Sequence, residues 1–361
     1  LKEIGHDQFI LPDIQENDDS SFPSFKWFSR PERLMECIRF QAELLETLRP
    51  DRVLGVFNFT LPISAGLTGI SYDSLICGCM LKDSEDILGF HGNEPDVADQ
   101  KTNLDTFFSF ATHKLNRALK TFTEMQINDV RDLLKGEMTY LWDFPEFMPL
   151  PRMDNTVYVG PVLLSGNGSI RFEKSAREHS HNPTAVLSFG TCSGSRAVLE
   201  RLTRICLDVG FDVVIAAGGQ KKYMSLFNDE QRVTFSLFPD LSRLLKDAAL
   251  LITHGGQISI FEALKSKVPV LVMPFQPEQA HNGICLERIG CGRLLIPPRP
   301  FRAGPKVYHD AFDSLDDHAI KQCILDLRDN QKTAVHLAEA CNVLDTYSGT
   351  EKLVAFLERP L

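Results

Sequence analysis

Short apolar runs alternate along this chain with segments of helical spacing, and one stretch shows the alternation most clearly. The apolar run 250–253 leads into a His-Gly-Gly turn, a segment of helical spacing covers 257–264, and a second apolar run follows over 268–274. Short apolar runs bounded by Gly and Pro are typical of buried strands. The stretch therefore predicts strand, turn, helix and strand, the βαβ unit of a parallel sheet.

The rest of the chain continues this alternation. In the second half we expect strands at 185–189, 212–217, 233–237 and 293–296, and helices at 197–209, 241–246, 314–328, 330–344 and 348–358. In the first half we expect helices at 31–48, 62–67 and 107–122, strands at 53–57, 71–80, 139–141 and 157–161, and loops at 13–30 and 83–103. Strands that alternate with helices predict open α/β sheets covered by helices.

A length of 361 residues exceeds one ordinary core, so two domains are expected. Gly, Ser, Asn and charged residues over 165–183 indicate the linker between them. We assign 1–164 to an N-terminal domain and 184–329 to a C-terminal domain, followed by helices over 330–361. The first eleven residues have the pattern of a helix end, a Gly stop and a strand, which predicts that a first strand and helix precede Leu1.

Composition and charge argue against several classes of partner. The chain is 43% hydrophobic and 24% charged, values typical of soluble globular proteins. A formal net charge of −10 argues against nucleic acid, because phosphate backbones are held by clustered Lys and Arg. No apolar run of about 18 residues occurs, so no transmembrane segment is expected, while peripheral membrane contact stays open.

The nine cysteines are scattered and odd in number, unlike a disulfide framework. Cys77 and Cys79 have no second Cys or His pair nearby, so no metal site is expected there. Buried thiols and a reducing cytoplasm are the expectation.

The His-Gly-Gly turn carries the most informative chemistry. His254, Gly255 and Gly256 lie where a strand's carboxyl end meets a helix amino end, and there the backbone N–H groups have no helical acceptor. The helix dipole adds roughly half a positive charge, and glycines let an anion approach the main chain. The turn therefore predicts a diphosphate site in which His254, protonated or donating an N–H, holds a phosphate oxygen. A histidine that caps its own turn is the alternative.

Three further groups are expected at the same sheet edge. The loop that contains Thr191 follows a predicted strand and precedes a predicted helix, so we expect it to donate hydrogen bonds to a phosphate or a sugar. The alternative is a plain tight turn. Glu262 offers a carboxylate to ribose hydroxyls, or else only complements the helix dipole. Glu278 and Gln279 follow the next apolar run and suit sugar hydroxyls, the alternative being a solvated loop pair.

Together these motifs resemble the nucleotide-sugar domain of GT-B glycosyltransferases of the UDP-glycosyltransferase-like family, which includes plant, macrolide and antibiotic glycosyltransferases. The resemblance covers about 184–295 and rests on Ser188 to Thr191, Thr253-His254-Gly255-Gly256, Ser259, Glu262-Ala263-Leu264, Val268-Pro269 and Glu278-Gln279. It is looser in the first half, where it rests on Gly5-His6, 51–57, 65–70 and 158–161.

The resemblance implies two facing Rossmann-like domains that enclose a cleft, with the acceptor on the first, the nucleoside diphosphate sugar on the second, and the helices over 330–361 returning to the first. Carried over residue by residue, it places the diphosphate on Thr191, His254, Gly255, Gly256, Gln257 and Ser259. It places the ribose on Glu262 and the donor sugar on Glu278 and Gln279.

Three features depart from the family pattern. The family's sugar-contacting pair is Asp-Gln, and Glu278-Gln279 stands in its place here. Leu237 and Asp240 stand where the family carries a Trp and a Gln, so we expect Phe238 and Pro239 to face the donor base. The family's catalytic base is a histidine after the first strand, and the resemblance places that histidine upstream of Leu1.

The expected activity is that of an inverting, metal-independent hexosyltransferase without a cofactor, acting as a monomer or homodimer. It would move a sugar from a UDP-sugar, or as second choice a dTDP-sugar, to a hydroxyl of a small lipophilic or phenolic acceptor. Two other classes stay open. One is a catalytically silent partner protein of the same fold, and the other is a sugar-nucleotide epimerase that releases the diphosphate without an acceptor.

Overall fold

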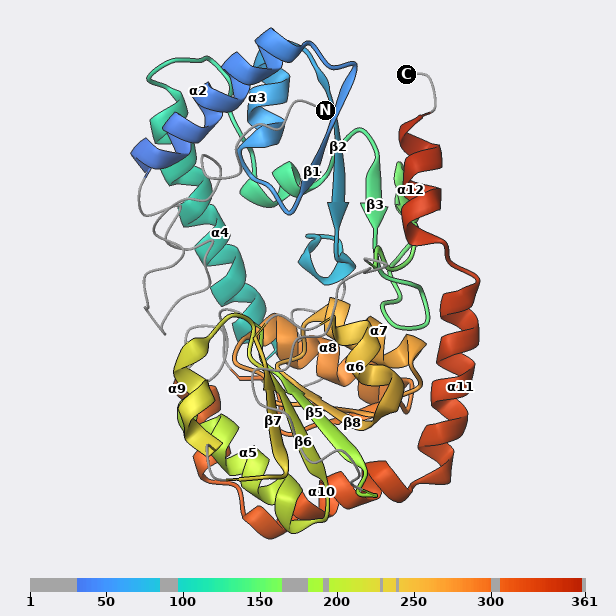
Figure 1. Ribbon diagram of the computed structural model, residues 1–361. Helices are drawn as coiled ribbons and strands as arrows, with labels where there is room; N and C mark the ends of the chain where they lie inside the picture. Colours follow the sequence, from blue (N-terminus) through green and yellow to red (C-terminus); the bar gives the residue numbers. More distant parts are fainter. Residues whose placement is uncertain are drawn as a thin grey trace.

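The computed structural model describes residues 31–84, 97–163, 181–190, 195–227, 230–237, 240–299 and 306–358. These residues form two parallel sheets, each covered by helices, in two lobes that lie one above the other in Figure 1. The expected α/β class with two Rossmann-like units is confirmed, because most of the predicted apolar runs within these residues form parallel strands and most of the periodic segments form covering helices.

The first lobe holds a four-stranded sheet of order β1-β2-β3-β4. Its elements are α2 (Pro31–Leu48), β1 (Arg52–Val56), α3 (Leu61–Thr68), β2 (Ser71–Ile76), η3 (Gly78–Met80), α4 (Val97–Leu119), η4 (Val130–Leu134), β3 (Thr139–Leu141) and β4 (Thr156–Tyr158). The prediction of a loop over 83–103 is wrong for its last residues, because α4 begins at Val97. Lys101 and Thr102 are exposed, so the polar residues at its start form the solvent face of a helix.

The second lobe holds a six-stranded sheet of order β10-β9-β8-β5-β6-β7. Its elements are β5 (Thr184–Ser188), α5 (Arg196–Asp208), β6 (Asp212–Ala216), η5 (Lys221–Phe227), β7 (Val233–Ser236), α6 (Leu241–Leu244), η6 (Leu245–Asp247), β8 (Ala248–Thr253), α7 (Gln257–Lys265), β9 (Val270–Val272), α8 (Pro277–Arg288), β10 (Gly292–Leu294), α9 (Lys306–Asp313) and α10 (Asp317–Asp329). The strand order reverses between β5 and β8, and ligands of open α/β sheets bind at such a switch point.

The last two helices connect the lobes. Helix α11 (Gln331–Asp345) packs on α7, and α12 (Gly349–Leu357) runs up beside β3, as the red ribbon of Figure 1 shows. Leu353 of α12 is buried in one cluster with Leu75 and Tyr140 of the first sheet. The expected return of the C-terminal helices to the first lobe is thus confirmed.

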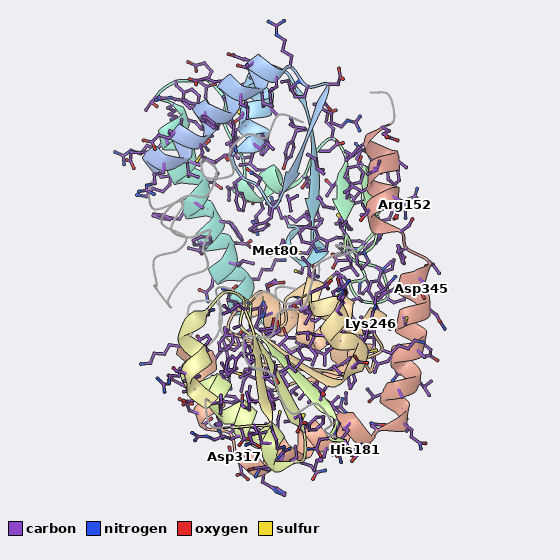
Figure 2. All side chains as sticks on the ribbon, viewed as in Figure 1. Met80, Arg152, His181, Lys246, Asp317 and Asp345 are labelled. Atoms are coloured by element: carbon purple, nitrogen blue, oxygen red, sulfur yellow. The ribbon has the colours of Figure 1, made fainter. Side chains whose placement is uncertain are left out.

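Aromatic side chains fill the seam between the lobes. Phe144 and Phe147, in the turn after β3, lie with ring centroids 5.7 and 5.1 Å from that of Phe261 on α7. Nη2 of Arg288 donates to the carbonyl of Phe147 at 2.5 Å. Figure 2 shows Met80 at the edge of the first lobe that faces the second, where side chains occupy the space between the ribbons. The carboxyl ends of the first sheet therefore meet the switch point of the second.

Candidate functional site

The strand ends at the switch point bring two loops together. Ser188, the last residue of β5, is the register partner of Thr253, the last residue of β8. A Cβ atom on Gly190 would lie 3.2 Å from Cε1 of His254, so the loop after β5 lies directly against the His-Gly-Gly turn. Thr191, which continues this loop, lies outside the described residues.

The turn itself depends on a glycine. Gly255 has φ +97°, and a Cβ atom there would lie 2.7 Å from the carbonyl oxygen of Gln279. Helix α7 begins after Gly256, which provides no side-chain cap, and the first helical bond runs from Ile260 N to Gly256 O at 3.1 Å. The amides of the first three helical residues consequently have no acceptor within the helix, which is the arrangement that suits an anion.

His254 is half-buried at the start of this turn. Burial lowers the pKa of its imidazole to about 4, although a hydrogen bond to the carbonyl of Ser188 raises it in part. The ring is therefore neutral near pH 7, and its single N–H is directed to Ser188 on the neighbouring strand. The structure thus disfavours the imidazolium expected from the sequence, and the neutral ring would donate to a phosphate oxygen only by turning its N–H away from Ser188.

Ser259 and Glu262 are three residues apart on α7 and so share one face of the helix. Glu262 is half-buried, and burial together with the negative charge of Asp240 raises the pKa of its carboxyl. Asp240 immediately precedes α6, so the N-terminus of α6 lies close to Glu262. Phe238 and Pro239, which precede Asp240, lie outside the described residues.

Glu278 and Gln279 lie in the first turn of α8, and the alternative of a solvated loop pair is wrong. Oε1 of the buried Gln279 accepts a hydrogen bond from the amide of Phe275 at 2.8 Å. Oε1 of Glu278 accepts from Nδ2 of Asn282 at 2.6 Å, and the same Nδ2 donates to the carbonyl of Gly255 at 2.9 Å. Asn282 thus ties the carboxylate of Glu278 to the His-Gly-Gly turn.

Helix α8, Asn282 and two residues that reach the site from the first lobe were not predicted from the sequence. Trp142 and Asp143 follow β3 directly, and both contact Gln257 at the start of α7. Asp143 is fully buried, and burial raises the pKa of its carboxyl to about 7. Asp143 follows a buried strand, as Glu278 does, so the same signal in the sequence could have identified it.

Cys77 and Cys79 lie beside this site with their Sγ atoms 3.8 Å apart, and both are unbridged. Among the described residues, no three His, Cys, Asp or Glu side chains converge as metal ligands would. No helix within the described ranges is long and apolar enough to cross a membrane.

Comparison with known proteins agrees with this fold. Residues 193–296 match the family model described as the glycosyltransferase family 28 C-terminal domain. The uncharacterized UDP-glucosyltransferase YojK of Bacillus subtilis is 25% identical over 227 residues, which cover 61% of this chain and 51% of that protein. The chain spans about half the length of the curated relatives it matches.

Two solved structures share the fold. The glycotransferase of kitacinnamycin superposes with a TM-score of 0.69 at 16% identity, covering 92% of this chain and 83% of its own. The Streptomyces sp. SF2575 glycosyltransferase SsfS6, complexed with thymidine diphosphate, gives a TM-score of 0.61 at 17% identity and covers 94% of this chain and 78% of its own.

The fold is that of the GT-B class. Within that fold, residues 193–296 of the second lobe match a glycosyltransferase family 28 C-terminal domain, and the chain is similar in sequence to a protein named a UDP-glucosyltransferase.

Proposed function

We propose that this protein transfers a sugar from a nucleoside diphosphate sugar to a hydroxyl of a small lipophilic or phenolic acceptor. The observation that carries the proposal is the uncapped N-terminus of α7 at the switch point, with the half-buried Glu262 one turn further along the helix. Related proteins support a nucleotide donor, since YojK is named a UDP-glucosyltransferase and SsfS6 was solved with thymidine diphosphate. A UDP-sugar is the first choice and a dTDP-sugar the second.

In this proposal the donor lies across the second lobe. The amides of Gly255, Gly256 and Gln257, with His254 and Ser259, hold the diphosphate, and Glu262 holds the ribose. Glu278 and Gln279 contact the sugar at the amino end of α8. Thr191 near the diphosphate, and Phe238 and Pro239 at the base, stay predictions because they lie outside the described residues.

The reaction we propose inverts the anomeric centre. The acceptor oxygen attacks the anomeric carbon opposite the diphosphate, the bond from that carbon to the diphosphate oxygen breaks, and a base takes the acceptor proton. Base catalysis of this kind contributes roughly 10²–10⁴-fold. The amides and dipole of α7 stabilise the charge that grows on the leaving diphosphate, so the proposed hexosyl transfer proceeds without a metal.

Calorimetric titration with UDP and dTDP tests the donor site. We expect Glu262→Ala to weaken binding of the preferred nucleotide about tenfold, because two ribose hydroxyls lose their acceptor. Glu351→Ala is the matched control, since Glu351 is an exposed carboxylate in the first turn of α12. Equal affinity of wild type and Glu262→Ala would remove the ribose assignment. Binding of neither nucleotide would contradict the proposed function, and binding without transfer to any acceptor would favour a silent partner protein.

A further inference from the structure

One side chain of the proposed diphosphate turn is held from the opposite lobe. Nε1 of Trp142 donates to Oε1 of Gln257 at 2.5 Å, and Nε2 of Gln257 donates to Oδ1 of Asp143 at 2.6 Å. Gln257 is the first residue of α7, and only 6% of it is exposed. Both ends of its carboxamide are thus engaged by consecutive residues that follow β3.

Asp143 is itself fixed within the first lobe. Its Oδ2 accepts a hydrogen bond from the amide of Gly78 at 2.5 Å, and its side chain is fully buried. The titratable groups that face it are Glu278 of α8, the thiols of Cys77 and Cys79, and the phenol of Tyr158 on β4. None of these is a cation, and no ion pair involves Asp143 within the described residues.

A buried carboxyl without a cation is costly, so it persists only where its hydrogen bonds are well formed. Two of the contacts that compensate Asp143 come from different lobes, one from Gly78 and one from Gln257. Separating the lobes would break the second contact, so Asp143 would keep only the Gly78 amide and Gln257 would lose its bonds to both Trp142 and Asp143. The same separation would release the first residue of α7, whose backbone N–H belongs to the proposed diphosphate site.

We propose that Trp142 and Asp143 are positioning residues for the donor site: through Gln257 they couple closure of the two lobes to the orientation of the diphosphate-binding turn. We call the set Trp142, Gln257 and Asp143 the interlobe bridge. The inference rests on the proposed function. It adds that the acceptor lobe takes part in donor binding without touching the donor.

UDP titrations of bridge variants test this inference. Trp142→Phe keeps an aromatic ring but removes the indole N–H, and Gln257→Leu keeps the backbone amide but removes the carboxamide. We expect each to weaken UDP binding about tenfold, and the double variant to weaken it no further than either single change, because both act through one contact. Arg288→Met is the matched control, since it removes another hydrogen bond across the seam, to Phe147, and leaves the bridge intact.

A spectroscopic measurement separates coupling from a general loss of structure. The chain has two tryptophans, so Trp27→Phe leaves Trp142 as the single reporter. We expect UDP to shift the emission of Trp142 in this background and in its Arg288→Met derivative, and the shift to disappear with Gln257→Leu. UDP affinities of Trp142→Phe and Gln257→Leu within twofold of a UDP-binding wild type would overturn the bridge alone. A wild type that binds neither UDP nor dTDP would overturn the bridge and the proposed function together.

Discussion

Nδ2 of Asn282 lies 2.6 Å from Oε1 of Glu278, one helical turn earlier on α8. The same nitrogen donates to the carbonyl of Gly255, so a single buried amide holds both a carboxylate and a turn whose glycine has a positive φ. This contact explains why two motifs more than twenty residues apart in the sequence keep one relative geometry.

Asn282→Ala removes both hydrogen bonds and leaves two acceptors without this donor. We expect it to lower the free energy of unfolding by about 1–3 kcal/mol, the usual cost of an unsatisfied buried polar group, as measured by urea denaturation. Gln322→Ala is the matched control, because its amide also bonds a carboxylate four residues away, at 2.7 Å to Asp326, but on an exposed face. Similar losses for both variants would argue against a special role for Asn282.

Gly255→Ala places a Cβ atom where no space exists. Gly255 has φ +97°, and the new atom would lie 2.7 Å from a backbone oxygen and 2.8 Å from Cγ1 of Val272. We expect roughly 3 kcal/mol of destabilisation from strain and clash together, and loss of UDP binding. Gly210→Ala is the control for backbone strain alone, because Gly210 has φ +93° and nothing lies within 4 Å of the added Cβ atom. We expect this substitution to lower the free energy of unfolding by only about 1 kcal/mol. Equal destabilisation by the two substitutions would show that the backbone of α8 can move away from the added Cβ atom at little cost in stability.

The buried carboxyls make stability depend on pH. Burial raises the pKa of Asp143 and that of Glu278 to about 7, well above the roughly 4 of an unfolded chain. Between about pH 4 and pH 7 the native state keeps protons on these carboxyls that the unfolded state has lost. The stability that the two carboxyls contribute is therefore fully present below about pH 4 and is lost as pH rises through about 7. We therefore expect the Tm of Asp143→Asn relative to that of wild type to increase by a few degrees as the pH is raised from 5 to 8.

Thermal melts at several pH values measure this difference. Asp345→Asn, at an exposed carboxyl on α11, serves as the control for the loss of one negative charge. A difference in Tm between Asp143→Asn and wild type that stays constant from pH 5 to pH 8 would contradict the raised pKa.

The histidine of the turn has the opposite dependence. Burial lowers the pKa of His254 from 6.5 to about 4. Between these pH values the imidazole is protonated in the unfolded state and neutral in the native state. The corresponding stability is present above about pH 6.5 and is lost as pH falls towards 4. We expect ring nitrogen shifts in NMR to report a neutral imidazole at pH 5.5, with the signal assigned by its loss in His254→Gln. A ring that titrates near pH 6.5 would contradict the buried placement.

Much of the fold was predictable because its signals are local. Helix α2 runs from Pro31 to Leu48 as its periodicity predicts, and β3 covers Thr139 to Leu141 as its apolar run predicts. Helix α8 was not predicted, since it contains Gly283 and buries the polar residues His281 and Asn282, so its sequence shows no clear apolar stripe.

The sequence by itself determined where the strands end and which side chains follow them, because apolar runs, glycines and helix starts depend on neighbours in the chain. From these, His254, Gly255 and Glu262 were assigned to one sheet edge. Only the tertiary structure decided that Gln257 meets Trp142 and Asp143, more than a hundred residues away, and that His254 is neutral. Those properties follow from burial and from contacts across the seam, and both arise only when the two lobes pack together.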